Sequence, residues 1–187
     1  MTIRSYKDIM PTIASSAYVD ETAVVIGDVV IGEDSSLWPM CSVRGDTNFI
    51  RIGARTSIQD GTIIHVTHAY SAVPDGYPVI IGNDVTVGHK VMVHGCTIED
   101  LVLIGMDSTI LDGALIRSHV LLAAGSLVTE GQELEGGYLW LGRPAKKVRP
   151  ITDEEQTWFE YVANHYVELK NDYTKPLGKG PVSAQQT

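Results

Sequence analysis

A six-residue period runs through most of the chain and constrains its fold more than any other feature. Aliphatic residues recur at every sixth position, and the phase slips only a few times. The series is Val19, Val25, Ile31, Leu37, Val43, Ile52, Ile58, Ile64, Ile81, Val87, Val93, Ile98, Ile104, Ile110, Ile116, Leu122 and Val128. An amphipathic helix would instead repeat every 3.6 residues. A six-residue period is typical of a β-solenoid, in which each hexad forms one short strand and a corner.

A small or β-branched residue stands four positions after most of these anchors, and glycine often follows an anchor directly. Examples are Ser35, Cys41, Thr47, Thr56, Thr62, Val85, Val91, Thr97, Ser108, Ala114, Val120 and Ser126. This pattern resembles that of the hexapeptide-repeat proteins, which implies a mainly β fold, the left-handed parallel β-helix, with three sides. Seventeen anchors at three per coil then predict between five and six coils.

The end of the repeats is followed by signals for one helix. Residues 142–150, GRPAKKVRP, contain two prolines and should close the solenoid. Thr152 with Glu155 three residues later predicts a capping box at the start of a helix, and apolar residues follow at helical spacing. We expect a left-handed β-helix domain over 1–150, a C-terminal helix over 151–170 that covers the solenoid or a neighbouring subunit, and a flexible tail over 171–187.

Charge and cysteine content exclude several classes of protein. The net charge is −9, and no basic run is longer than Lys146 and Lys147, so a nucleic-acid or anionic-membrane surface is not expected. The two cysteines, Cys41 and Cys96, are too few for a disulfide scaffold. The N-terminal residues lack the apolar region of a signal peptide, and no stretch approaches the ~18 apolar residues of a membrane span. The sequence therefore predicts a cytoplasmic protein.

One arginine and two histidines stand at equivalent positions of the repeat. Arg44, His65 and His94 each directly follow an anchor, and these anchors are three apart in the series if the insertions lie at corners. They should then form an outward column on successive coils. Adjacent strands of a parallel sheet are ~4.8 Å apart. His65 and His94 should therefore lie within reach of a single metal ion.

The third histidine, His89, belongs to the preceding face. The same count places Gln59 next to Gly88 and Asp60 next to His89, one coil apart. One chain would therefore not unite all three imidazoles, but a three-fold homotrimer could set one face against the neighbour's other face. Three histidines with an open position suit catalytic zinc, and iron or cobalt accept the same ligands.

The site residues together resemble one family. Arg44-Gly45-Asp46, Gln59-Asp60, His65, His89 and His94 match the γ-class carbonic anhydrases in order, spacing and repeat context, over roughly residues 10–150. The segments DGTIIHVTH and VTVGHKVMVHGCTI resemble its bacterial YrdA-like branch.

That resemblance implies a reaction and a set of roles. The reaction is the reversible hydration of CO₂ to bicarbonate by metal-bound hydroxide in a homotrimer with metal sites at subunit interfaces, with Zn²⁺ or alternatively Fe²⁺ or Co²⁺. His65 and His94 would bind the metal from one subunit and His89 from its neighbour. Arg44 and Asp46 would pair across the interface, Gln59 would hydrogen-bond the hydroxide, and Asp60 would orient the site.

The sequence departs from the best-characterised pattern of the family at the positions expected to carry the proton of the hydration reaction out of the site. Thr47 replaces an acidic residue, and the loop over residues 69–78 offers only Asp75. His68 is a candidate substitute, while His119 and His165 are interpreted as ordinary surface residues.

Three other functions stay open: a hexapeptide acyltransferase, which uses one histidine base, an acyl-CoA thioesterase with the same metal, and a non-catalytic metal-binding trimeric scaffold. Cys41, Trp38 and Trp140 are interpreted as packing residues.

Overall fold

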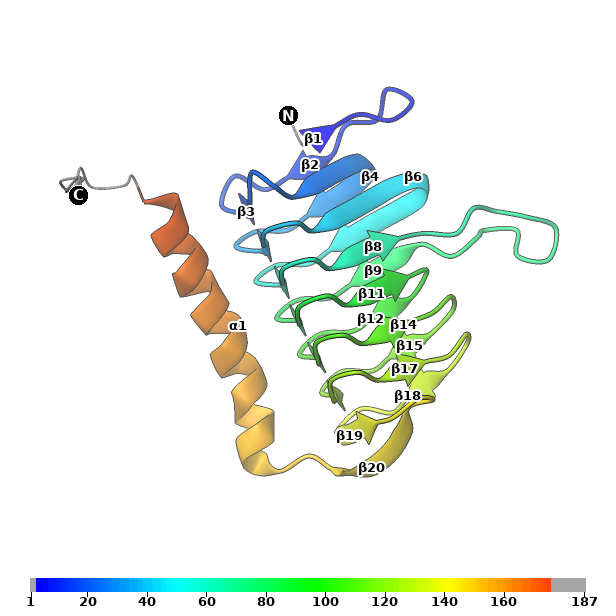
Figure 1. The fold of residues 1–187 in the computed structure, drawn as a ribbon, viewed down its shortest axis with the longest axis vertical. Coiled ribbons are helices and arrows are strands. Elements are labelled where there is room, and N and C mark those ends of the chain that lie inside the picture. The colour runs from blue at the N-terminus through cyan, green and yellow to red at the C-terminus, as the bar shows by residue number, and fades with distance from the viewer. Residues whose placement is uncertain (1–2, 176–187) are drawn as a thin grey trace, which may run out of the picture.

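Residues 3–175, which the computed structural model describes, form a parallel β-helix with one C-terminal α-helix alongside it (Figure 1). The strands lie in two sheets. The first contains β1 (Ile3–Arg4), β2 (Thr12–Ile13), β4 (Val24–Ile31), β6 (Ser42–Ile52), β8 (Ile63–His65), β9 (Val79–Ile81), β11 (Met92–His94), β12 (Thr97–Ile98), β14 (Thr109–Ile110), β15 (Leu115–Ile116), β17 (Leu127–Val128) and β18 (Glu133–Leu134). The second contains β3 (Tyr18–Val19), β5 (Ser36–Leu37), β7 (Ser57–Ile58), β10 (Thr86–Val87), β13 (Leu103–Ile104), β16 (Leu121–Leu122), β19 (Tyr138–Leu141) and β20 (Lys146–Pro150).

The strands are arranged on three faces. On the first face β6, β8, β11, β14 and β17 pair in that order, and on the second β6, β9, β12, β15 and β18 do so. The long strand β6 joins these two faces because its first half pairs with β8 and its second half with β9. The third face is the row from β3 to β19, and all of its pairs are parallel except the last, where β20 runs antiparallel to β19. The predicted parallel solenoid is confirmed.

The six-residue anchors form the core. All predicted anchors are buried except Val19, which is half-buried at the first coil. Each buried aliphatic side chain removes apolar surface from water, which stabilises the stack by about 25 cal/mol per Å². The predicted count of five to six coils is too low, because the third face alone has seven parallel strands from β3 to β19. Leu134 and Trp140 continue the series after Val128, with an aromatic residue in place of the last aliphatic anchor.

All three phase slips of the repeat lie at the corner between the first and second faces, as the sequence suggested, because the anchors before them pair on the first face and the anchors after them pair on the second. Thr47 stands four positions after the anchor Val43, but β6 continues through it and Thr47 is exposed. Within β6, Gly45 lies so close to the backbone of Asp28 that a side chain at this position would clash with it. Between Val93 and Ile98 the repeat is one residue short. There Cys96, at 2% exposure, takes the buried position of the small residue, and Thr97 is only half-buried.

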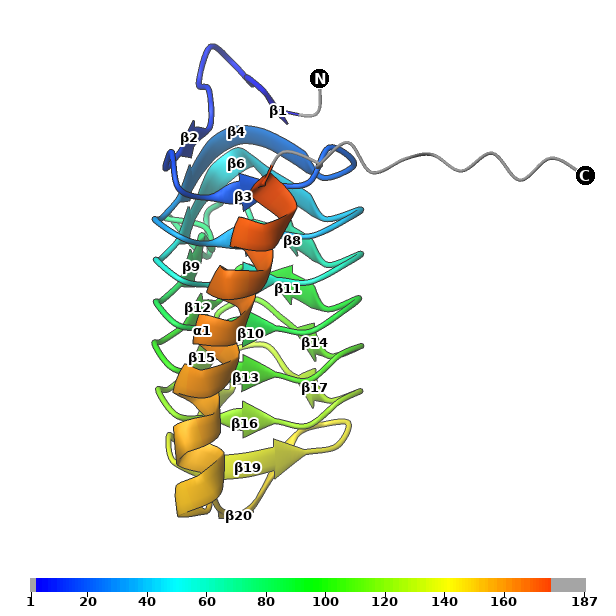
Figure 2. The ribbon, with the colours of Figure 1, turned by 90° about the vertical axis from the view of Figure 1, so that its left-hand side faces the viewer.

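The helix α1 (Asp153–Thr174) lies along the third face (Figure 2). Thr152 caps it, and the predicted capping box with Glu155 is confirmed. Phe159 and Ala163 are buried against the solenoid, and Lys170 is buried in an ion pair with Asp34 at 2.9 Å.

The C-terminal end of this helix lies beyond the predicted boundary. The helix ends at Thr174, four residues beyond the predicted 170. Most of the predicted tail lies outside the described residues. Within residues 3–175 no helix combines the length and the apolar character needed to cross a bilayer.

Replacement of Glu155 by glutamine should reduce thermal stability at neutral pH and much less at low pH. Two hydrogen bonds from Arg149, of 2.7 and 2.8 Å, and one from the backbone of Thr152 lower the pKa of Glu155 from 4.5 to about 2. A carboxyl group with a lowered pKa stabilises the fold above its unfolded pKa, and this contribution is lost as the pH falls toward the folded pKa. Glutamine can keep the capping box, so only the charge is removed.

The measurement is a series of thermal unfolding curves by circular dichroism. The difference in melting temperature between wild type and E155Q should be constant above about pH 4.5 and shrink between about 4.5 and 2. Because the group is largely exposed, the difference should be small. A difference that does not change with pH would contradict the assignment.

Candidate metal centre

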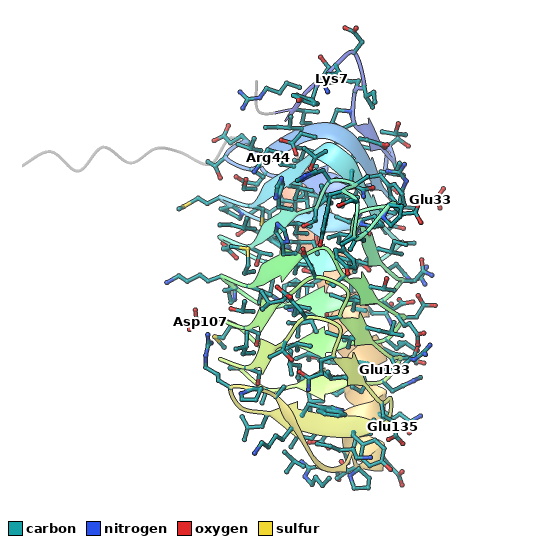
Figure 3. The ribbon with its side chains drawn as sticks, turned by 90° about the vertical axis from the view of Figure 1, so that its right-hand side faces the viewer. Lys7, Glu33, Arg44, Asp107, Glu133 and Glu135 are labelled. Atoms are coloured by element: carbon teal, nitrogen blue, oxygen red, sulfur yellow. The ribbon has the colours of Figure 1, made fainter. Side chains whose placement is uncertain are left out.

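The first face carries the predicted column of outward side chains. Arg44 lies opposite His65 in the pairing of β6 with β8, and His65 lies opposite His94 in the pairing of β8 with β11. The three residues therefore occupy successive coils, as the repeat predicted. Figure 3 views the solenoid from the side opposite α1 and shows Arg44 beside its upper coils.

The two histidines of this column face each other. Nδ1 of His65 is 3.1 Å from Nε2 of His94. The other nitrogen of each ring contacts a carboxylate: His65 Nε2 is 3.1 Å from Asp46 Oδ1, and His94 Nδ1 is 2.5 Å from Asp112 Oδ1. All four side chains are between 14% and 30% exposed, so the cluster is shielded but open to solvent on one side.

The protonation of these rings follows from their partners. An ionised carboxylate can only accept, so the nitrogens that face Asp46 and Asp112 carry the ring protons. A neutral imidazole has one N–H, and both remaining nitrogens, 3.1 Å apart, then present lone pairs to each other. Such a contact is repulsive unless a cation lies between the lone pairs. Two nitrogen ligands of tetrahedral Zn²⁺, each about 2.0–2.1 Å from the ion, lie about 3.3 Å apart. The donor pair therefore fits a metal ion.

The charge states of this cluster agree with that arrangement. Burial lowers the pKa of His65, and the neighbouring Arg44 cation lowers it further, against the opposing effect of Asp46. Burial alone would raise the pKa of Asp46, but hydrogen bonds from Arg44 and His65 outweigh it and lower that pKa. A neutral imidazole beside an ionised carboxylate is the state in which a histidine binds metal.

His89 lies on a different part of the solenoid. It follows β10, and its Nδ1 lies 2.9 Å from Oδ2 of Asp60, as the predicted stacking of these two residues requires. Both side chains are 48% exposed. Within the part of the chain that the structure describes, no three His, Cys, Asp or Glu side chains are grouped so as to hold a metal. One chain thus brings together His65 and His94 but not His89.

Arg44 and Asp46 form an ion pair within the chain. The pair places a cation beside Asp46, which in turn contacts His65. The pair across a subunit interface that the family resemblance implies stays a prediction.

Sequence reasoning missed Asp112. Its second oxygen accepts a hydrogen bond of 2.6 Å from Thr67 Oγ1, so Asp112 joins His94 to the first residues after β8. A signal was present, because Asp112 follows the anchor Ile110 by two positions, one coil beyond His94. The role depends on the direction of the side chain, which the repeat alone does not give.

The connection between β8 and β9, residues 66–78, projects from the solenoid as an arm on the side away from α1 (Figure 1). Asn48 fixes its base by donating to the backbone oxygens of Thr67 and Asp75, at 3.1 and 2.8 Å. His68 is exposed on this arm, and its ring centroid is 6.0 Å from that of Tyr70. The proposed proton transfer by His68 stays a prediction.

A groove of about 450 Å³ lies between α1 and the third face. Gln59, which is 5% exposed, and His89 line it from the solenoid. Trp158, Tyr161, His165 and Tyr166 line it from the helix. Burial raises the pKa of Tyr166, and the negative charge of Asp60 raises it further. The helix therefore contributes side chains to the surroundings of His89. His165 is an exposed surface residue, as the sequence predicted, and it also lines this groove.

The two cysteines take no part in this chemistry. Burial raises the pKa of Cys41 to about 12 and also raises that of Cys96, so both thiols stay protonated at neutral pH. Both are core residues, as are Trp38 and Trp140, and the packing interpretation of Cys41 and the two tryptophans is confirmed.

Comparison with known proteins places the chain among hexapeptide-repeat proteins. No protein-family model matches it. Protein YrdA of Escherichia coli K12 is 52% identical over 171 residues, which are 91% of this chain and 93% of that protein. Gamma carbonic anhydrase 2, a mitochondrial protein of Arabidopsis thaliana, is 42% identical over 170 residues, 90% of this chain and 60% of that protein. A solved hexapeptide transferase family protein from Anaplasma phagocytophilum has a TM-score of 0.86 and 37% identity, covering 92% of this chain and 98% of that one.

Proposed function

Because the chain belongs to the hexapeptide-repeat family that includes the γ-class carbonic anhydrases, we propose that it is a metal-dependent carbonic anhydrase. The observation that carries this proposal is the pair of imidazoles at 3.1 Å, His65 and His94, whose outer nitrogens are held by Asp46 and Asp112. Hydrogen-bonded carboxylates fix the orientation of metal-binding histidines in this way. The reaction is the reversible conversion of CO₂ and water into bicarbonate and a proton.

The proposal requires a second copy of the chain. His89 is exposed, and Asp60 occupies its Nδ1, so its Nε2 is the nitrogen that can bind a metal. In a three-fold homotrimer the first face of one subunit would meet the His89 region of the next, and each site would gain its third imidazole. The trimer and a location in the cytoplasm are parts of the proposal.

Zinc is the metal that we propose, with Fe²⁺ or Co²⁺ as alternatives that suit the same imidazoles. When bound, such an ion acts as a Lewis acid that makes hydroxide available from water near neutral pH.

The chain's own residues supply position and charge. Asp46, Asp60 and Asp112 orient the three histidines, and Arg44 keeps Asp46 ionised. The amide of Gln59, on the wall of the groove beside His89, would orient the reacting water by a hydrogen bond.

Acyl transfer from coenzyme A is the main alternative, since a similar solved structure is described as a hexapeptide transferase family protein. Coenzyme A carries several phosphates, which proteins commonly bind with Arg or Lys. The groove beside His89 is lined by apolar, aromatic and neutral polar residues and by two histidines, and no Lys or Arg is among the described residues that line it. This groove therefore favours a small neutral substrate over an acyl-CoA, for transferase and thioesterase alike.

Stopped-flow CO₂ hydration tests the proposed function. Protein purified without oxygen should be loaded separately with Zn²⁺ and Fe²⁺, and its metal content and molar mass in solution measured alongside. We expect one ion per subunit, a trimeric mass, and hydration that rises in proportion to the bound ion. A fully metallated trimer with no hydration above the buffer rate would refute the enzyme and favour the metal-binding scaffold.

A further inference from the structure

The proposed reaction releases a proton that must leave the site. Hydration of CO₂ gives one bicarbonate and one proton per turnover, and export of that proton needs a group that exchanges protons near neutral pH. Thr47 and the acid-poor arm do not supply the expected carboxylates, and Asp75 is the arm's one acidic residue. The described structure offers an imidazole at another place.

His165 lines the groove from the helix side, opposite Gln59 and His89. Its side chain is exposed, so one side of the ring can meet bulk solvent. Two tyrosines hold the ring: Tyr161 lies parallel to it at 6.3 Å between centroids and 11° between planes, and Tyr166 lies edge-on at 5.5 Å. His165 is thus a positioned imidazole between the groove and solvent.

We propose that His165 transfers the proton of the hydration reaction from the groove to buffer, an inference that rests on the proposed function. Its neutral ring accepts the proton through water in the groove and becomes imidazolium. The imidazolium then gives the proton to a buffer base in solution, so the ring returns to its starting state and no other atom is exchanged.

The other histidines are less well placed for this task. His89 has its Nδ1 on Asp60 and is assigned to the metal. His119 packs edge-on against Phe159, at 6.0 Å between ring centroids, and does not line this groove. His68 lies on the exposed arm against Tyr70, outside the same groove. His165 is therefore the one imidazole among the groove's described lining residues that has no other assigned role.

The test compares H165A, H68A and H119A with wild type by stopped-flow CO₂ hydration in weak and strong buffer. H165A should lose kcat in weak buffer by about 10-fold or more, because proton transfer by a positioned side chain contributes at least that much. Its kcat/KM should stay unchanged, because CO₂ is consumed before the proton is exported. Imidazole added to the buffer should restore its kcat, and H119A should behave as wild type. A purely structural defect would lower both kinetic parameters and would not respond to imidazole.

A second measurement does not depend on activity. In protein labelled with ¹⁵N-histidine and loaded with paramagnetic Co²⁺, the ring signals of His165, assigned by their loss in H165Q, should shift or broaden relative to the Zn²⁺ form. The signals of His119 should not.

The outcomes separate the two proposals. If a metallated wild type does not hydrate CO₂, the proposed function and the proton transfer both fail. If wild type is active but H165A keeps its kcat in weak buffer, or H68A shows the buffer-dependent loss instead, the role of His165 alone is wrong. Unchanged His165 signals in the Co²⁺ form would also overturn it.

Discussion

Replacement of His94 by alanine is expected to remove the metal and abolish CO₂ hydration. His94 stands between the ring of His65 and the carboxylate of Asp112, so its loss takes away one of the two imidazoles that a single chain brings together. Replacing a residue that only orients a metal ligand typically costs about 10–100-fold in metal affinity or activity. Loss of a ligand itself should cost more than about 100-fold in hydration rate.

Two further variants test whether the loss of metal in H94A is specific to the proposed site. D112N keeps the size of the side chain but weakens the contact with His94 Nδ1, and it should lose about 10–100-fold in metal affinity while the protein stays folded. H119A removes a histidine that packs against Phe159 and should keep its metal. Metal content by mass spectrometry, hydration rate and thermal unfolding would be measured for all three. If H94A binds one metal per subunit and hydrates CO₂ normally, the assignment of the site is wrong.

Two neighbouring isoleucines should differ widely in their contribution to stability. Ile81 on β9 points into the core and is 2% exposed, whereas Ile80 on the same strand points outward and is 40% exposed. Replacement of a buried isoleucine by alanine removes apolar contacts and leaves a cavity, which costs about 2–5 kcal/mol. I81A should therefore lower the free energy of unfolding by that amount. I80A should change it by less than about 1 kcal/mol, because its side chain is partly in water already.

Chemical denaturation at a fixed protein concentration measures both variants, since oligomer formation would make stability depend on concentration. The two substitutions are identical and lie one residue apart, so strand propensity and position along the solenoid are matched. A loss for I81A as small as the one expected for I80A would contradict the placement of β9 on the second face.

The period of six predicted much of the fold, because in a parallel solenoid the repeat fixes which residues share a face. The column of Arg44, His65 and His94, and the pairing of Asp60 with His89, depended on that count and on the placement of the insertions at corners. The predicted number of coils is too low because the repeat continues beyond Val128, first with Leu134 and then with the aromatic Trp140.

The parts of the site that the sequence did not reveal depend on tertiary contacts. Asp112 reaches His94 from the turn after β14, and its other oxygen is held by Thr67, 45 residues away in the chain. His165 joins the groove only because α1 lies along the third face. Phe159, Ala163 and the ion pair of the buried Lys170 with Asp34 hold the helix in this position. The repeat places Asp112 one coil beyond His94 but does not give the direction of its side chain. Helical periodicity likewise shows which residues share a helix face but not where that face docks.

The reversed strand β20 has a consequence for how these molecules associate. Further strands can pair with either end of a stack of parallel strands. An unpaired last strand could therefore pair with the first strand of another chain, and repetition of this pairing would produce a fibre. Here the last strand of the third face is covered by a strand of opposite direction that ends in Pro150 and carries Lys146, Lys147 and Arg149, all exposed. Charged residues and proline on an edge strand resist further pairing. At the opposite end of the stack, β1, β2 and β3 are only two residues long. These features oppose fibre growth along the axis at the third face, and they are consistent with the side-by-side association of the proposed homotrimer.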